Sequence, residues 1–252
     1  MANLSTHNFD SLYSLFKGEP GLRKSGAAVS YPKPYFFDWD MKIDALQMPV
    51  KNWGINKADI EFDSYKDWDS AKKKLEQLQV NCKYKTLVID SITSMADAAV
   101  RQTTRFKGEG GKKVGTIAVG GFDEYNAEAA AIAELIALTK DIKDFHHVNI
   151  ILIGHIIQKE MKSANGNTHM ARVLVTAGKS IAQKIPAYCS EIYHFNIVTG
   201  MDVSKGGQYA LKTTHTGDDF ARTSIGLEPE IVFGDKPLYD GWIKPAMELM
   251  SK

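Results

Sequence analysis

The sequence is poor in cysteine and has no large excess of charge of either sign. Its two cysteines, Cys82 and Cys189, are too few for a disulfide framework and favour a reducing compartment. Lysine and arginine together number 31, and aspartate and glutamate 30. Composition therefore gives no argument for nucleic-acid binding, which must rest on local clusters of basic residues.

Long apolar runs are also absent. No stretch of the sequence approaches the ~20 apolar residues of a membrane-spanning helix, and the N-terminus, Met-Ala-Asn-Leu-Ser-Thr-His, is short and polar. We therefore expect a cytoplasmic protein with no membrane partner. With 252 residues, 44% of them hydrophobic, the chain can bury a good core as one large domain or as a domain with appendages.

The rest of the chain is organised around the stretch from Leu12 to Gly26. An apolar run of strand character leads into a Gly/Pro turn, and Lys24-Ser25 opens a segment of small residues that can start a helix. This is the setting of a phosphate-binding P-loop, in which backbone N–H groups surround the phosphates, a lysine supplies positive charge and a hydroxyl binds magnesium. The alternative is a Gly/Pro turn with an incidental Lys-Ser pair. The candidate loop comprises Gly18, Glu19, Pro20, Gly21, Leu22, Arg23, Lys24, Ser25 and Gly26.

The loop motif is interrupted at Arg23, where the pattern Gly-x-x-x-x-Gly-Lys-Ser/Thr has its second glycine. Glycine at this point lets the backbone approach the phosphates closely. A side chain in the left-handed region costs roughly 1–2 kcal/mol, which phosphate binding could offset. The charge of Arg23 could also hold the nucleotide directly.

Carboxylates end two buried strand patterns downstream of the loop. Thr86–Asp90 is an apolar run that ends in an acid, typical of a central parallel strand, and Asp90 can hold magnesium. The strand after the loop ends at Asp38 and Asp40, either of which can polarise the water that attacks the γ-phosphate. Alternation places Asp40 nearer the loop edge, so we favour it, and Asp38 alternatively caps a turn. His155, just past the next buried strand, can sense the γ-phosphate or be purely structural.

Buried strand patterns alternate with helical patterns along the chain, which predicts an α/β fold with a mostly parallel central sheet flanked by helices. Asp67 suits the N-cap of a helix whose apolar residues recur at helical spacing. Residues 41–59 lack a clear period and are expected to be irregular. The expected strands are 12–18, 35–40, 60–63, 86–90, 148–153 and 191–197. The expected helices are 24–30, 67–78, 91–100, 123–145, 179–185 and a short one after Pro237. A late β-hairpin is expected to include 209–214, with a turn at Gly217-Asp218.

Two basic loops leave neighbouring strands at one edge of the expected sheet. Residues 101–122 and 159–178 have the glycine-containing, basic composition that suits phosphate backbones, and Phe106 could stack on a base. Solvated surface charge is the alternative for either loop taken alone. The candidate DNA contacts are Arg101, Arg105, Lys107, Lys112, Lys113, Lys162 and Arg172.

In this order and spacing, the segments resemble the RecA-like recombinase core. The motifs that carry the resemblance are Gly18-Glu-Pro-Gly-Leu-Arg-Lys24-Ser25, similar to its phosphate loop, Phe36-Phe-Asp-Trp-Asp40, similar to the strand with the catalytic carboxylate (usually Glu), Leu87-Val-Ile-Asp90-Ser91, similar to its second acidic motif, and Ile151-Leu-Ile-Gly-His155, similar to its strand and sensor. The two basic loops fall where the family has its two DNA-binding loops. The resemblance implies a single RecA-like ATPase domain over residues 1–252, with its core at about 12–233 and a C-terminal tail at 234–252.

Among subfamilies, the chain most resembles the small phage ATPases associated with single-strand annealing and recombination, which implies the cytoplasm of a bacterial host. The resemblance implies a DNA-stimulated ATPase that binds single-stranded DNA, with ATP and Mg²⁺ held between subunits of a ring or filament. A single-strand-binding protein is a further expected partner. The implied catalytic residues are Lys24, Asp40 and His155, and the implied metal ligands are Ser25 and Asp90.

The resemblance also suggests residues that act across a subunit boundary. Lys212 and Arg222, around the late hairpin, are candidates for reaching a neighbour's γ-phosphate. Arg23 and Asp40 depart from the family pattern, which bears on the rate of hydrolysis more than on nucleotide binding. Two alternatives therefore stay open: a nucleotide-gated DNA-binding scaffold that hardly hydrolyses ATP, and a RecA-like ATPase that acts on a protein partner, such as a helicase loader.

Overall fold

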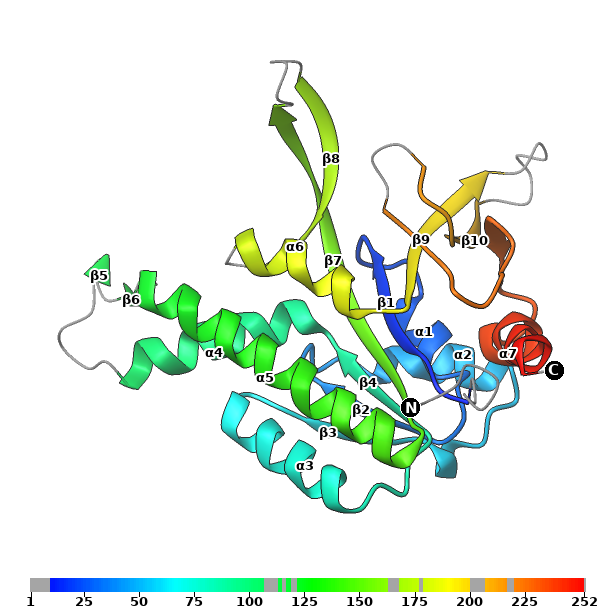
Figure 1. Cartoon of the computed structure of the whole chain (residues 1–252), viewed down its shortest axis with the longest axis horizontal. Coiled ribbons are helices and arrows are strands. Elements are labelled where there is room, and N and C mark those ends of the chain that lie inside the picture. Colours follow the sequence, from blue (N-terminus) through cyan, green and yellow to red (C-terminus); the bar gives the residue numbers. More distant parts are fainter. Residues whose placement is uncertain are drawn as a thin grey trace, which may run out of the picture.

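A central sheet of nine strands runs through the molecule, with helices against both faces (Figure 1). The computed structural model describes residues 10–106, 113–114, 117–118, 122–162, 168–176, 179–199, 207–216 and 220–251. The strands of the sheet are β1 (Tyr13–Gly18), β2 (Pro34–Asp38), β3 (Glu61–Ser64), β4 (Thr86–Asp90), β7 (Asn149–Lys162), β8 (Thr168–Leu174), β9 (Glu191–Thr199), β10 (Gly207–Lys212) and β11 (Glu230–Val232). The longer helices are α1 (Lys24–Ala28), α2 (Gln47–Asn52), α3 (Trp68–Val80), α4 (Ile92–Phe106), α5 (Phe122–His146), α6 (Lys179–Tyr188) and α7 (Lys244–Met250).

The strands lie in the order β11-β10-β9-β1-β7-β4-β2-β3, and β8 pairs with β7 off this path. From β9 to β3 the neighbouring strands run parallel, whereas β8, β10 and β11 pair antiparallel. The predicted α/β fold with a mostly parallel sheet is therefore confirmed, and it is the architecture of a P-loop NTPase core.

Each face of the parallel strands carries its own apolar core, because successive side chains of a strand point to opposite faces. In β4, Leu87 and Ile89 join the core under α3, α4 and α5, whereas Val88 joins the core under α1, α2 and α7. β1 alternates in the same way, with Leu15 on the first face and Phe16 on the second. Burial on both faces explains why these strands are continuous apolar runs in the sequence.

The carboxyl ends of the parallel strands meet along one edge of the sheet. The register pairs Gly18 of β1 with His155 of β7, and Asp38 of β2 with Asp90 of β4. Strands β2 and β4 lie on one side of β1, and β9 lies on its other side. The order of the strands therefore changes direction at β1. Open α/β sheets bind ligands outside the carboxyl ends of their strands at such a point.

The segment 41–59, predicted to be irregular, is largely helical. It contains the 3-10 turns η2 (Ile43–Leu46) and η3 (Lys57–Asp59) on either side of α2. Pro49 is tolerated because it lies in the first turn of α2, where backbone N–H groups have no helical partner. Helices this short hold too few residues to show an apolar period, so the sequence pattern missed them.

The first predicted loop, 101–122, is shorter than expected. α4 continues past Val100 to Phe106, since neither glycine nor proline interrupts the sequence before Gly108. Beyond α4, the structure describes two short paired strands, β5 (Lys113–Val114) and β6 (Ile117–Ala118).

The prediction of a second loop over 159–178 is wrong. β7 runs on to Lys162 and pairs with β8 from Ile156↔Leu174 to Lys162↔Thr168. These residues form a two-stranded ribbon, here called the β7–β8 ribbon, that extends away from the sheet (Figure 1). Because the described side chains of the ribbon beyond Ile156 are exposed or half-buried, the ribbon lacks the apolar run that marks the central strands.

One helix boundary late in the chain also differs from expectation. The helix predicted to end before Pro186 continues to Tyr188 as α6. The guanidinium of Arg222 donates to the carbonyl oxygens of Pro186 and Cys189, which holds the last turn of α6 in place. In the late hairpin, β10 pairs with both β9 and β11. The predicted turn at Gly217-Asp218 lies outside the described residues.

The C-terminal segment is helical, as predicted, and it packs against the core of the sheet, which was not predicted. A π-helical turn, η6 (Tyr239–Ile243), leads directly into α7. Although the sequence suggests a tail here, three apolar side chains of this segment lie in the core under α1 and α2: Leu238, Ile243 and Met247.

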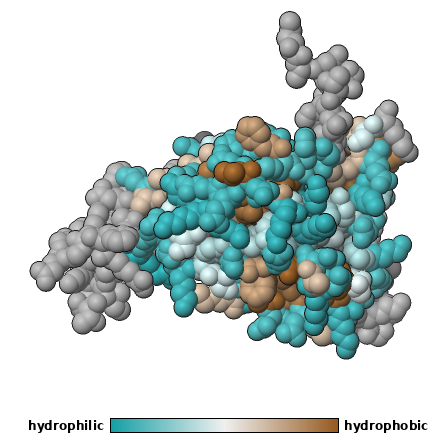
Figure 2. All heavy atoms as spheres, turned by 90° about the horizontal axis from the view of Figure 1, so that it is seen from below, coloured by the Kyte–Doolittle hydropathy of each residue, from teal (hydrophilic) through white to brown (hydrophobic). Residues whose placement is uncertain are grey.

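Figure 2 shows a face of the molecule on which hydrophilic side chains predominate and apolar side chains form small, separate patches. In the part of the chain that the structure describes, no helix is both long and apolar enough to cross a bilayer.

Candidate nucleotide-binding site

β1 leads the chain into a tight loop at Gly18. A Cβ atom on Gly18 would lie 2.8 Å from the carbonyl oxygen of Phe195, so no side chain fits there. Gly21 has φ +84°, which glycine adopts without strain. The loop turns into α1 at Arg23, whose φ of 59° is also left-handed. The position therefore has the conformation for which the motif uses glycine, and Arg23 adopts it at a cost of roughly 1–2 kcal/mol.

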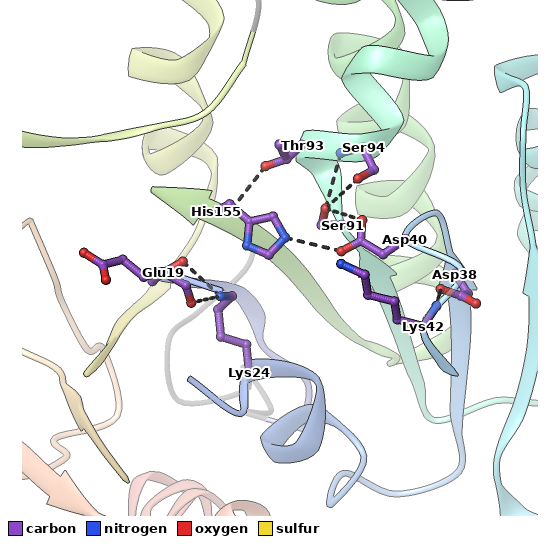
Figure 3. A network of polar contacts seen from close by, with 10 residues as sticks. Glu19, Lys24, Asp38, Asp40, Lys42, Ser91, Thr93, Ser94 and His155 are labelled. Atoms are coloured by element: carbon purple, nitrogen blue, oxygen red, sulfur yellow. Dashed lines mark hydrogen bonds and ion pairs between the residues drawn. The ribbon is translucent and has the colours of Figure 1, made fainter. Parts of the chain in front are cut away.

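The side chain of Lys24 turns back over the loop (Figure 3). Its Nζ donates to the carbonyl oxygens of Gly18, at 2.9 Å, and Glu19, at 2.7 Å. Burial lowers the pKa of Lys24 to about 8, and the carboxylates of Asp90 and Asp40 limit that fall. A buried ammonium group whose hydrogen bonds go to neutral carbonyls gains from exchanging them for charged phosphate oxygens, so the geometry suits the predicted phosphate contact.

Asp90 ends β4 beside the start of α1. Burial raises the pKa of Asp90 to about 6, and the nearby carboxylates of Asp40 and Asp38 act in the same direction. The hydrogen bond that Asp90 accepts from Ser25 acts in the opposite direction. A hydroxyl and a carboxylate in contact are hard oxygen ligands of the kind that Mg²⁺ takes. A divalent cation would also relieve the electrostatic cost of the buried carboxylate. Ser25 and Asp90 therefore fit the predicted metal role.

Asp40 lies across the site from Lys24 (Figure 3). Its Oδ1 accepts from the Ser91 hydroxyl at 3.0 Å, and its Oδ2 lies 3.3 Å from Nε2 of His155. Burial would raise the pKa of Asp40, but the hydrogen bonds from His155, Ser94 and Ser91 outweigh burial and hold the pKa well below its usual range. Asp40 is therefore a fixed, ionised carboxylate.

His155 stands where β7 leaves the central sheet and enters the ribbon. Its backbone N–H donates to Thr93 Oγ1 at 3.1 Å, which ties the strand to the first turn of α4. Its imidazole contacts Asp40, so the two residues predicted separately as base and sensor form one pair.

Asp38 has a different role from Asp40. It is buried, and its two oxygens accept from the backbone N–H of Lys42, at 3.1 Å, and from the Ser64 hydroxyl, at 3.1 Å. Both contacts hold the turn after β2 against β3. The turn-capping alternative considered for Asp38 therefore describes its position.

The predicted residues converge on one cavity of about 280 Å³. The loop residues 20–26, Asp40, Asp90 and His155 form one part of its wall. The other part comes from the segment predicted to be irregular and was missed by the sequence reasoning; it consists of Lys42, Ala45, Met48, Pro49 and Asn52. The sequence offered one signal for this second part of the wall, namely that the segment directly follows Asp40. Figure 3 shows the Lys42 side chain extending toward the Asp40 carboxylate.

A comparison with protein families identifies the chain. The family described as an AAA domain matches residues 14–225, well over half of the chain. The chain belongs to the AAA domain family. A comparison with curated proteins finds no match. AAA domains of this P-loop type are ATPases that bind nucleotide, typically with Mg²⁺, so the coarser part of the prediction, a nucleotide-binding P-loop ATPase, is confirmed.

Arg23 of this AAA domain is exposed, and its side chain reaches the late strands. Its guanidinium carbon lies 4.2 Å from the ring centroid of Tyr209 on β10. Such a cation–π contact contributes about 0.5–1 kcal/mol at an exposed site, which offsets part of the left-handed backbone cost. The loop residue that breaks the motif is therefore held by a specific contact to the late strands.

The described residues among those predicted to bind DNA belong to two separate projections of the AAA domain (Figure 1). The first is the far end of α4 with β5 and β6, where Arg101 is exposed. The second is the β7–β8 ribbon, on which Arg172 is exposed. Arg105 and Lys113 belong to α4 and β5, and Lys162 ends β7. Lys107 and Lys112 lie outside the described residues.

The two residues predicted to act on a neighbouring subunit differ in their surroundings. Lys212 ends β10, half-buried and in register with Glu230 of β11. Arg222 uses its guanidinium within its own chain, on the carbonyl groups at the end of α6. A role of Arg222 in another subunit would require these hydrogen bonds to break.

Proposed function

We propose that this AAA domain is an ATP- and magnesium-dependent RecA-like ATPase that binds single-stranded DNA and assists annealing or recombination. The observation that carries the proposal is the convergence of Lys24, the Ser25–Asp90 pair and the Asp40–His155 pair on one cavity. A positive charge, a metal-binding pair and a fixed carboxylate are the parts that phosphoryl transfer to water requires.

Each residue of the cavity has its own role in the proposed hydrolysis of ATP. Lys24 exchanges its carbonyl partners for the outer phosphates of ATP. Asp40, fixed by Ser91 and His155, accepts a hydrogen bond from the attacking water and orients it. Ser25 and Asp90 would hold the magnesium ion, which would supply positive charge beside the phosphates. A carboxylate with a low pKa is a weak general base, so Asp40 positions water more than it removes a proton, and we expect slow turnover without DNA.

Two basic projections support the DNA part of the proposal. Single-stranded DNA is held by basic grooves and stacking side chains, and the log of its affinity falls with log salt by roughly 0.7 per phosphate neutralised. Neutralising Lys159 and Arg172 on the ribbon, or Arg105 of α4 together with Lys112 and Lys113, should flatten that slope. Lys73→Gln, on the exposed face of α3, is the control. Slopes that match the control in both sets of variants would refute DNA binding by these projections.

The decisive experiment is ATPase turnover with and without single-stranded DNA. Stimulation supports the proposal, and Lys24→Ala should abolish both nucleotide binding and turnover. Nucleotide binding that survives Lys24→Ala would refute the P-loop site. Assembly into a ring or filament, with Lys212 reaching a neighbour's γ-phosphate, and a single-strand-binding protein as partner extend the same proposal.

Two other functions are each favoured by one observation. The low pKa of Asp40 favours a nucleotide-gated DNA-binding scaffold with little hydrolysis, which would bind DNA in an ATP-dependent way at negligible turnover. The exposed apolar side chains Ile157, at 52%, and Met170, at 50%, on the ribbon favour an ATPase that acts on a protein partner, such as a helicase loader. That function predicts turnover that DNA does not stimulate.

A further inference from the structure

A second cavity, of about 410 Å³, lies beside the P-loop. Arg23 lines both this cavity and the nucleotide cavity, so the two share a wall. The rest of the lining comes from β10, from β11 and from residues 233–242, and it includes the rings of Tyr209, Phe233 and Trp242. None of these residues belongs to the P-loop motif or to the acidic strands.

We propose that this second cavity takes the purine base of the nucleotide whose phosphates bind at the P-loop. The inference rests on the proposed nucleotide site and extends it to the base. The volume lies within the ~300–1,000 Å³ that is usual for small-molecule sites. The shared wall at Arg23 makes the two cavities neighbouring compartments, one lined by phosphate-binding groups and the other by aromatic rings.

The rings supply the stacking surface that a base needs. Tyr209 and Trp242 are half-buried and pack against the core, while each also lines the cavity. Phe233 is buried, and an edge contact with the ring of Phe195, at a centroid distance of 5.6 Å, holds its ring in place. The guanidinium of Arg23 already lies over the Tyr209 ring. Guanidinium planes and aromatic rings are the groups on which nucleic-acid bases stack in proteins.

The cavity wall also carries polar groups that can meet the edge of a base. The Gln208 side chain is exposed and offers both a donor and an acceptor. The backbone at Gly234 is held in place by a 3.0 Å hydrogen bond from Trp53 Nε1 to its carbonyl oxygen. A purine presents a larger stacking face than a pyrimidine, so the site should prefer ATP to CTP.

This assignment also gives Arg23 a role. A glycine at that position would have no side chain to reach Tyr209, whereas Arg23 connects the phosphate loop to the aromatic wall. The residue that departs from the motif would then contribute to base binding rather than to hydrolysis.

The test compares ATP with inorganic tripolyphosphate, which carries the phosphates without the base. Binding of each to the full chain with Mg²⁺ is measured by calorimetry for the natural protein, Tyr209→Leu and Gln208→Ala. Tyr188→Leu is the matched control, because Tyr188 also carries a cation over its ring, Lys140 Nζ at 4.8 Å, but lines a different cavity. We expect Tyr209→Leu to weaken ATP binding by about 10-fold or more, Gln208→Ala to weaken it less, and neither to change tripolyphosphate binding.

Each other outcome overturns the inference in a recognisable way. If Tyr209→Leu weakens ATP and tripolyphosphate equally, Tyr209 acts on the loop through Arg23 and not on the base. Unchanged ATP binding in both variants, or a natural protein that binds ATP no tighter than tripolyphosphate, refutes the base pocket while leaving the P-loop site intact. Failure of the proposed function has a different signature, since Lys24→Ala would then leave both ligands bound.

Discussion

At the scale of single residues, Asp90 carries an electrostatic cost in the nucleotide site that depends on pH. Its pKa rises from 3.8 to about 6 on burial, which corresponds to about 3 kcal/mol at 1.36 kcal/mol per pKa unit. Because the folded-state pKa lies above the unfolded value, the cost is fully present above pH ~6 and disappears as the pH falls below ~4. In metal-free buffer, Asp90→Asn should therefore raise the free energy of unfolding by up to about 3 kcal/mol at pH 7.5 and by much less at pH 4.5.

Urea unfolding at the two pH values measures this effect, with the exposed Asp59→Asn as control. The same Asp90→Asn protein should need more Mg²⁺ to bind ATP, because it loses a charged oxygen ligand. Stability gained equally at both pH values would show that the charge of Asp90 is not the cause.

Asp40 should be necessary for turnover and dispensable for nucleotide binding. Asn carries no charge and replaces one acceptor oxygen with an NH₂ donor, so the attacking water loses its orientation, and we expect Asp40→Asn to lower the rate of ATP hydrolysis by about 10²-fold while ATP affinity is retained. Single-turnover hydrolysis and equilibrium binding measure the two quantities. Asp38→Asn is the matched control, since Asp38 holds a turn and should affect stability more than rate. If ATP affinity falls in parallel with the rate, Asp40 acts in binding instead.

At the scale of secondary-structure elements, α3 depends on its N-cap. The Asp67 side chain accepts a 2.9 Å hydrogen bond from the backbone N–H of Ser70, an otherwise unpaired donor in the first turn. Asp67→Ala should cost about 1 kcal/mol of unfolding free energy, whereas Asp67→Asn, which can cap equally well, should cost little. Chemical denaturation of the three proteins checks this, and equal losses in Ala and Asn would point to the charge of Asp67 rather than to capping.

The elements that could be predicted are those whose environment leaves a pattern in the sequence. β1, β4 and the first part of β7 are buried on both faces, so their apolar runs were readable, and α3 shows its apolar spacing after a capping residue. The β7–β8 ribbon pairs through backbone hydrogen bonds in solvent, which places no constraint on side-chain polarity. Its residues therefore looked like a loop. The short α2 was missed because six residues cannot display a period.

The residues of the site likewise divide into those that a local sequence pattern predicts and those whose contacts no such pattern predicts. Strands that their apolar runs predict end at or shortly before Lys24, Asp90 and Asp40, and the topology of the parallel sheet brings those strand ends together. The Arg23–Tyr209 contact joins residues far apart in the sequence through the order of the strands across the sheet, and no local pattern encodes it. The pairing of His155 with Asp40 likewise depends on the strand order, so position predicted both residues without predicting their contact.

At the scale of the whole molecule, the C-terminal segment is an integral part of the core on the P-loop side of the sheet. The ring of Tyr239 packs on Tyr31 at a centroid distance of 4.7 Å, and its backbone N–H donates to Ser30 Oγ at 3.1 Å. These contacts join the end of the chain to the residues just after α1. The second cavity depends on the same packing, because Trp242 lies in η6.

Removing one buried side chain from this segment should therefore destabilise the entire fold. Ile243 is fully buried, and Ile243→Ala should lower the free energy of unfolding by about 2–5 kcal/mol through lost burial and the cavity left behind. Leu249→Ala is the matched control, because Leu249 is 69% exposed and a surface change of this kind usually costs within about 0.5 kcal/mol. ATP with Mg²⁺ should recover part of the Ile243→Ala loss, since a ligand that binds only the folded state stabilises it by mass action. Equal, small losses in the two variants would show that the segment is an appendage, and the aromatic wall beside Arg23 would then lack the rigid support that base binding requires.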